Sequence, residues 1–211
     1  TQNQAFSALL FLYKQVLEFD LPWLENVERA TKPKRLPTVL TRDEVDLLLA
    51  GLDGSLWLVG NLLCGSGLRL MEALRLRVKD LDLERRQVIV RDGKGHKDRA
   101  TMLAGSLAEP LRVHLGKVRL LHRQDLNSGY GEVYLPFALQ RKYPQAAREW
   151  GWQYVFPSAK RSTDPLSGRE GRHHIHAKTV QRAIRKAVQN AGISKQASSH
   201  TLRHGFATHL L

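Results

Sequence analysis

The sequence predicts a mainly α-helical fold with one small antiparallel β-sheet, an α+β arrangement. Apolar residues recur at helical spacing through most of the chain, whereas between about residues 78 and 102 they recur at every second position. With 211 residues and 42% hydrophobic content, the chain can form one substantial core and part of a second unit.

The composition favours a polyanionic partner. There are 33 Lys and Arg against 20 Asp and Glu, a formal net charge of +13, and the pI is near 10.2. Nucleic acid is favoured over an acidic membrane surface, because the sequence contains no basic amphipathic anchor helix and no apolar run of about 18 residues. The single cysteine, Cys64, lies in an apolar run, so we expect a buried thiol, no disulfide and a reducing cytoplasm.

The first 38 residues are expected to contain a helix and a basic linker. An apolar stripe over residues 4–19 predicts an amphipathic helix with too little around it to form a domain. Residues 26–38 contain two prolines among cations, which predicts an extended segment that either follows a phosphate backbone or is simply solvated. Its candidate DNA contacts are Lys32, Lys34 and Arg35.

Three helices are expected next. Thr41 and Glu44 form a capping box for a helix that ends near Gly51, and an apolar helix over about 56–64 should be buried. After the glycines at 65 and 67, a short helix opens at Leu68, with its core positions expected at Leu68, Met71 and Leu74. Arg69 then lies near a helix N-terminus, where free N–H groups and its guanidinium favour an oxyanion, and Glu72 can hold it in place.

The alternating region predicts strands at 87–91 and 99–102, and Leu81 and Leu83 are assigned to a preceding strand. The connection carries Lys94 between two glycines, where the backbone can approach a ligand closely. Taken alone, such a lysine is most often a solvated turn residue.

A long helix over about 107–121 leads into an unusual segment at 124–158, in which aromatic residues alternate with cations. This pattern suits stacking on unpaired bases, and the alternative is a small satellite core that includes Trp152 and Phe156. The candidate contacts are Arg141, Lys142, Tyr143, Trp150 and Trp152.

A polar loop over 158–176 ends with three histidines. No cysteine or acid completes a metal site there, so His173 and His174 are expected to contact phosphates or bases, or nothing, and no metal is expected. Apolar residues at 180, 184, 187 and 188 then predict a helix that stops at Gly192.

The last thirteen residues predict a helix with an apolar face at Leu202, Phe206 and Leu210, capped by Ser198 or Ser199. His200 and Arg203 project from one side of its first turn, where an imidazole can take a proton and a guanidinium can bind two phosphate oxygens. The alternative is that both are surface residues of a basic protein.

Two other motifs in this helix carry less weight. Arg203-His204-Gly205 matches the signature of histidine phosphatases, but there it follows a strand near the start of the chain. His200 and His204 have the spacing of a zinc helix, yet the glutamate of His-Glu-x-x-His is missing, and Arg203 would repel a dication.

Taken in order, these motifs resemble the catalytic domain of the tyrosine recombinases, the phage integrase type, over residues 36–211. The matching pieces are Gly67-Leu68-Arg69-x-x-Glu72, Gly93-Lys94-Gly95-x-Lys97-x-Arg99 and His200-x-Leu202-Arg203-His204-x-Phe206-Ala207-Thr208. The segment from Ala138 to Ser158 resembles, more narrowly, the extra insertion of the integron integrases.

The resemblance implies that residues 1–25 end a core-binding domain, 26–38 link it, and 39–211 form a catalytic domain with an insertion around 124–158. It implies that Arg69 and Arg203 clamp the scissile phosphate, that Lys94 protonates the departing 5′ oxygen, and that His200 assists proton movement at the nucleophile. Glu72 would buttress the site, and Lys97 would contact DNA. A tyrosine would form a 3′-phosphotyrosyl link, which allows rejoining without ATP, metal or another cofactor.

The sequence departs from this family at its end. The nucleophilic tyrosine follows the His-x-x-Arg helix in the family, and none of the five tyrosines here occupies that position, so we expect this chain to be inactive in cleavage. The full-length protein would be a bacterial cytoplasmic enzyme that acts as a homotetramer on duplex DNA and on folded single-stranded hairpins, inserting or excising gene cassettes. The other class that remains is a DNA-binding module without catalysis, either a decayed recombinase or a regulator.

Overall fold

The computed structural model describes residues 2–19, 30, 38–91, 97–135, 137–164 and 168–209. The chain forms two compact units, Thr1–Leu36 and Pro37–Leu211. The smaller unit contains α1 (Gln2–Phe11) and a π-helical turn, η1 (Leu12–Val16), with no buried residue in either. The Asn3 side chain donates to the Ala30 carbonyl at 2.8 Å and accepts from its N–H at 3.1 Å. The linker cations Lys32, Lys34 and Arg35 lie outside the described residues.

The larger unit begins with the predicted helical pair. The capping box of Thr41 and Glu44 is present at the start of α2 (Arg42–Ala50), because each side chain accepts from the other residue's backbone N–H. The apolar helix is α3 (Gly54–Gly65), whose buried residues are Leu58, Val59, Gly60, Leu62 and Leu63. Burial raises the pKa of the Cys64 thiol to about 11, so it is protonated at neutral pH.

The expected core of the third helix was wrong in one position. The helix, α4 (Leu70–Arg75), begins two residues later than predicted, with Arg69 as its N-cap. Leu68 is therefore buried in extended chain before the helix, and Met71 turns to solvent at 37% exposure. Leu74 is fully buried, as predicted, and Ala73 is fully buried in place of Met71.

A three-stranded antiparallel sheet follows in the order β1 (Leu81–Asp82), β2 (Gln87–Val90) and β3 (Arg99–Met102), after the 3₁₀ turn η3 (Val78–Asp80). Val88 and Val90 point into the core, and Val90 pairs with Arg99 across the strands. Both predicted long strands are confirmed, whereas Leu83 lies in the turn after β1. The hairpin that carries Lys94, residues 92–96, lies outside the described residues.

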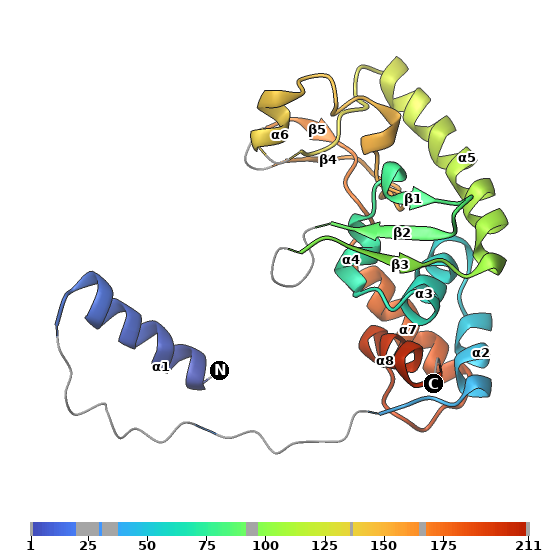
Figure 1. Cartoon of the computed structure of the whole chain (residues 1–211), viewed down its shortest axis with the longest axis horizontal. Helices are drawn as coiled ribbons and strands as arrows, with labels where there is room; N and C mark the ends of the chain where they lie inside the picture. Colours follow the sequence, from blue (N-terminus) through green and yellow to red (C-terminus); the bar gives the residue numbers. More distant parts are fainter. Residues whose placement is uncertain are drawn as a thin grey trace. The chain divides into compact units, whose positions relative to one another are not determined.

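Helix α5 (Gly105–Asn127) runs along one end of the sheet and leads to the predicted insertion, around residues 124–158, which lies on the opposite side of the sheet from α8 (Figure 1). A small hairpin of β4 (Ser162–Thr163) with β5 (Glu170–Gly171) follows it. The predicted insertion itself contains α6 (Phe137–Lys142) and η4 (Trp150–Trp152). It has a satellite core, against which Trp152 packs, formed by Val133, Leu135, Ala146, Ala147 and Tyr154. Phe156, expected there, is instead fully buried in the main core.

The chain returns through α7 (Ala177–Asn190), whose four predicted apolar positions are all buried, and ends in α8 (Ser199–His209). Helices α2, α3, α7 and α8 gather on one side of the sheet, and α8 packs on the buried helix α3 (Figure 1). The mainly helical fold with small antiparallel sheets is thus confirmed.

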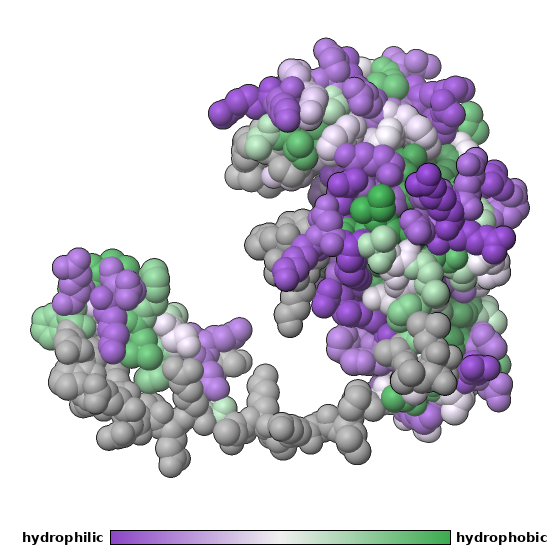
Figure 2. Space-filling model, viewed as in Figure 1, coloured by the Kyte–Doolittle hydropathy of each residue, from purple (hydrophilic) through white to green (hydrophobic). Residues whose placement is uncertain are grey.

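The surface agrees with the composition. Hydrophilic residues cover most of the face of the larger unit that Figure 2 shows, around the strands and the insertion. Among the described helices, none combines the length and the apolar composition needed to cross a bilayer. In the same part of the chain, no three His, Cys, Asp or Glu side chains are grouped so that they could hold a metal ion.

Candidate active site

The first turn of α8 presents two of the predicted residues to a common cavity. The Ser198 hydroxyl accepts from the backbone N–H groups of His200 at 3.3 Å and Thr201 at 3.4 Å, which confirms the serine cap. Leu202 is fully buried beneath the helix. Because His200 and Arg203 are three residues apart, this anchoring turns both side chains to the side away from the core, where both line the same cavity.

A glycine turn fixes the opposite wall. Gly67 has a φ of +62°, and a Cβ placed on it would lie 2.5 Å from Cδ1 of Phe206 in α8. Only glycine allows both the left-handed backbone and this close approach. The turn leads directly to Arg69 at the start of α4, so the packing of Phe206 on Gly67 brings α8 beside the Arg69 motif.

Glu72 is the anionic centre of this region. Its carboxylate accepts from the Arg69 backbone N–H at 2.8 Å and from the Arg69 side chain at 2.6 Å. Arg99 of β3 binds the same carboxylate through both terminal nitrogens, at 2.8 and 3.2 Å. Burial alone raises the pKa of Glu72, but these hydrogen bonds, first those from Arg99, outweigh it and lower the pKa to about 2.

The resulting cavity has a volume of about 330 Å³. Its wall comes from the glycine turn, from β3 and from α8, which are far apart in sequence. The lining residues are Ser66, Gly67, Arg99, Thr101, His200, Arg203, His204 and Phe206. Arg69 borders this group through Glu72 and Arg99 but does not line the cavity itself.

The electrostatics favour an anion beside a proton acceptor. Burial lowers the pKa of His200, and electrostatic interactions with His204, Arg203 and Arg69 lower it further. The imidazole is therefore neutral at neutral pH and can accept a proton. Burial and the neighbouring Arg69 lower the pKa of Arg203, but a guanidinium stays charged in proteins. Together these groups suit a phosphate that is attacked by a hydroxyl, because the guanidinium can bind the phosphate oxygens and the imidazole can take the proton of the hydroxyl.

Two other site residues were predicted in the connection between β2 and β3. Lys94 falls in residues 92–96, outside the described part of the chain. Lys97 is exposed just before β3, two residues from Arg99.

The predicted aromatic platform is divided between surface and interior. Arg141, Lys142 and Tyr143 are exposed at the end of α6 and just after it. Trp150 and Trp152 are partly buried in η4, and the Lys79 ammonium lies 2.8 Å from the centroid of the Trp152 ring. The satellite-core interpretation of Trp152 is thus confirmed.

His173 and His174, at the end of the predicted polar loop, differ in exposure. Their ring centroids lie 4.1 Å apart, and both rings contact Tyr154, His173 in a tilted and His174 in an edge-to-face arrangement. His174 is only 9% exposed, whereas His173 faces solvent. The prediction of a nucleic-acid contact therefore depends on His173. That residue also lines a cavity of about 430 Å³ between α6 and the β4–β5 hairpin, together with Tyr134, Gln140 and Arg169.

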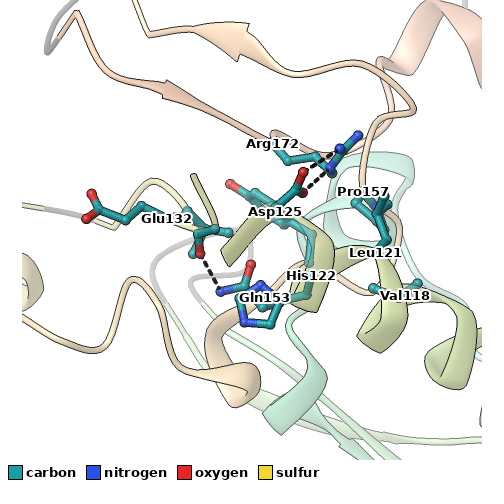
Figure 3. A pocket seen from close by; sticks show the side chains of 11 residues that line it. Val118, Leu121, His122, Asp125, Glu132, Gln153, Pro157 and Arg172 are labelled. Carbon is teal, nitrogen blue, oxygen red and sulfur yellow. Dashed lines mark hydrogen bonds and ion pairs between the residues drawn. The ribbon is translucent and has the colours of Figure 1, made fainter. Parts of the chain in front are cut away.

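A cluster at the base of the insertion has a structural role (Figure 3). Arg172 binds the buried carboxylate of Asp125 at 2.6 and 2.9 Å, and Gln153 donates to the Gly131 carbonyl at 3.4 Å. The space left among these side chains is about 10 Å³, no more than one water molecule needs. The cluster joins α5 to the β5 loop and offers no room for a substrate.

The sequence interpretation did not assign Arg99, Thr101 or His204 to the site. A signal for the first two existed, because residues two apart on a strand share one face, and Arg99 and Thr101 both face the cavity. His204 is one turn beyond His200, at a spacing that also placed it on this side of α8.

Comparisons with known proteins identify the relatives of this chain. Residues 38–211 match the phage integrase family. An integrase/recombinase of Escherichia coli is 51% identical over 211 residues, which are 100% of this chain and 63% of that protein. The chain thus spans less than two thirds of the length of that relative.

Two solved structures share the fold. The crystal structure of XerA recombinase has a TM-score of 0.57 and 24% identity, covering 95% of this chain and 58% of that one. The Tn1549 transposon integrase in complex with a circular intermediate DNA has a TM-score of 0.51 and 17% identity, covering 92% and 57%. From the family match over most of its length, the chain belongs to the phage integrase family, the tyrosine recombinases.

Proposed function

We propose that this chain supplies the phosphate-binding part of a site-specific DNA recombinase that cleaves and rejoins DNA through a 3′-phosphotyrosyl intermediate. One observation carries the proposal: a single cavity brings together the guanidinium of Arg203 and the neutral imidazole of His200, beside the ion-paired Arg69 and Glu72. A phosphodiester needs cationic donors for its oxygens, and its displacement by a hydroxyl needs a proton acceptor.

The residues would act in distinct ways. Arg69 and Arg203 bind the non-bridging oxygens and stabilise the charge that grows on them, while Glu72 keeps Arg69 in place. His200 takes part in removing the proton of the attacking hydroxyl, and Lys94 protonates the departing 5′ oxygen. The energy of the cleaved bond is kept in the phosphotyrosyl link, so rejoining needs neither ATP nor another cofactor.

The attacking tyrosine is not one of those in this chain. All five tyrosines, at 13, 130, 134, 143 and 154, are described, and none lines the cavity. We therefore expect the 211-residue chain to bind DNA without forming a covalent adduct. Denaturing electrophoresis after incubation with labelled DNA checks this, and a protein-bound label removed only by proteolysis would contradict it. A DNA-binding module without catalysis fits the same observation; cleavage by the full-length protein distinguishes the two.

Within the family, we assign the protein to the integron integrase type, which inserts or excises gene cassettes and acts on folded single-stranded hairpins. The insertion supports this, since its exposed Arg141, Lys142 and Tyr143 directly follow Gln140, which lines a cavity together with Tyr134 and His173. Aromatic rings in such a wall suit stacking on an unpaired base. Trp150 and Trp152 are further candidates for stacking on an unpaired base, although both side chains are partly buried.

The remaining parts of the chain would serve DNA binding and assembly. Residues 1–25 would end a core-binding domain, and Lys32, Lys34 and Arg35 of the linker 26–38 would follow the phosphate backbone. Residues 39–211 would form the catalytic domain, and the full-length bacterial protein would act in the cytoplasm as a homotetramer on DNA.

A salt titration tests the proposal. The affinity of the chain for a DNA hairpin with extrahelical bases is compared with that for its perfect duplex, and both should fall steeply with salt. A hairpin preference that persists at physiological salt supports the integron type, and coinciding curves leave only a general recombinase. Trp150→Ala should weaken hairpin binding by roughly 1–3 kcal/mol per stacked base and duplex binding little. Equal losses on both would make Trp150 structural.

A further inference from the structure

Arg99 is a third arginine of this region, besides Arg69 and Arg203. It binds the carboxylate of Glu72 and also lines the cavity. It binds Glu72 with a two-pronged fork, and its side chain is 35% exposed while that of Glu72 is 10% exposed. A guanidinium carries five N–H groups, so a fork that uses two of them on one carboxylate still has three to offer a ligand.

The strand register points Arg99 into the site. Arg99 and Thr101 lie on the same face of β3, and both line the cavity with His200 and Arg203. The Thr101 hydroxyl donates to the Ser66 carbonyl at 2.9 Å, which ties this strand to the glycine turn. Arg69 also binds Glu72, but it is not among the residues that line the cavity.

Charge balance favours a phosphate ligand for this arrangement. Arg69 and Arg99 form ion pairs with Glu72, and the charge of this carboxylate also acts on Arg203, so these four groups have a net charge of two positive units. A phosphodiester carries one negative charge, and more charge develops on its non-bridging oxygens as the bond is displaced. Two arginines and one glutamate would have a net charge of only one positive unit. The third guanidinium, that of Arg99, adds the positive charge that can stabilise the extra negative charge on the phosphate oxygens.

We propose that Arg99 is a further phosphate-binding residue of this site, holding Glu72 with one part of its guanidinium and a phosphate oxygen of bound DNA with another. The proposal rests on the proposed function. It differs from a structural role, in which Arg99 would only keep Glu72 and, through it, Arg69 in place.

Two variants distinguish phosphate binding by Arg99 from a purely structural role. Both variants lack the ion pair between Arg99 and Glu72. Glu72→Gln removes the carboxylate and leaves Arg99, and Glu72→Gln with Arg99→Gln removes both charges, so neither variant leaves a buried carboxylate unpaired. The affinity of the 211-residue chain for a duplex of about 30 base pairs is measured over a salt series. The matched control is Arg85→Gln, an arginine that is 80% exposed in the turn between β1 and β2.

If Arg99 contacts a phosphate, the double variant binds roughly tenfold more weakly than Glu72→Gln, and its slope of log affinity against log salt is smaller by about 0.9. Arg85→Gln changes neither quantity. Equal slopes for Glu72→Gln and the double variant would overturn the proposal, as would an equal effect of Arg85→Gln. If the unmodified chain shows no salt-dependent binding, the proposed function itself fails. Thermal unfolding of each variant verifies that the compared proteins are folded.

Discussion

The Nε2 atoms of His200 and His204 lie 2.9 Å apart, and the two rings meet edge to face with their centroids 4.3 Å apart. In such a contact one nitrogen donates and the other accepts, so the pair shares one proton along the bond. Protonation of both rings would break the hydrogen bond and place two like charges together. The state of His200 is therefore coupled to that of His204.

This coupling can be measured. Burial is the main cause of the lowered pKa of His200, and the charge of His204 is the next. We expect His204→Gln to raise the pKa of His200 towards the ordinary value of a histidine, as followed by NMR titration of the ring. His173→Gln, a change in the loop after β5, should leave it unchanged. An unchanged or lower pKa in His204→Gln would show that the contact does not influence the proton.

Stability should fall as the solution is acidified below neutrality. Burial is the first cause that lowers the pKa of His114, His122 and His200, so each binds protons less readily in the folded chain than in the unfolded one. Between about pH 6.5 and the lower folded pKa values, the unfolded state gains more protons and is favoured. Urea unfolding at pH 7.5 and 5.5 should give the larger free energy at pH 7.5. A constant or rising value on acidification would contradict this.

Glu72 should act in a lower pH window. Because its pKa is lowered to about 2, its contribution is present above the unfolded value of about 4.3 and is lost as the pH falls towards 2. We expect Glu72→Gln to lower the free energy of unfolding at pH 7 by about 1–2 kcal/mol, a moderate loss because both arginine partners are partly solvated.

The control for this change is Glu109→Gln. Glu109 pairs with Arg112 one turn along α5, but the two side chains are 69% and 58% exposed, so the loss should stay below about 0.5 kcal/mol. Chemical denaturation of both variants gives the comparison. Similar losses in the two would mean that burial of Glu72 adds nothing to its ion pairs.

The turn at Gly67 should tolerate no side chain. Gly67→Ala combines a left-handed backbone with a clash against Phe206, and we expect a loss of about 2–4 kcal/mol of stability. Gly192→Ala is the matched control, since its φ is +65° but no atom lies near the added methyl group, and about 1 kcal/mol is expected. If urea unfolding gives equal losses for both, the packing of α8 on the turn contributes little.

The base of the insertion depends on one buried ion pair. Asp125 is 5% exposed and binds Arg172 through both oxygens. Asp125→Asn leaves Arg172 without its anion, and about 2–4 kcal/mol of local stability should be lost. Hydrogen exchange should then accelerate in residues 168–176 more than in the sheet. Asp82→Asn, at a half-exposed pair with Arg85, should leave exchange in both regions unchanged.

Local patterns were enough to predict the parts of the site that lie on single elements. The spacing of His200 and Arg203 on one helix, and that of Arg69 and Glu72 at the start of another, determines which side chains can meet. The apolar pattern did not predict where α4 begins, because Leu68 is apolar and buried without being helical. Taking it as the first helical position shifted the expected core face onto Met71.

Contacts between distant elements could not be read in the same way. Arg99 lies 27 residues from Glu72, and only the pairing of β2 with β3 and the packing of the sheet beside α4 bring the two together. The sequence shows that Arg99 and Thr101 share one face of a strand, but it does not show which residues that face meets. The assignment of Phe156 to the main core rather than to the satellite core likewise depends on tertiary packing.

The packing of Phe206 on Gly67 also affects the order of folding. These two residues are far apart in sequence, so their contact closes a loop that contains the sheet, α5 and the insertion. Contacts of such long separation form late and slow the folding of a domain. On the ribosome, α2 to α7 emerge before α8, and until then the surface of α3 that α8 covers stays open. A nascent chain therefore carries Arg69 and Glu72 long before it has a cavity able to hold a phosphate.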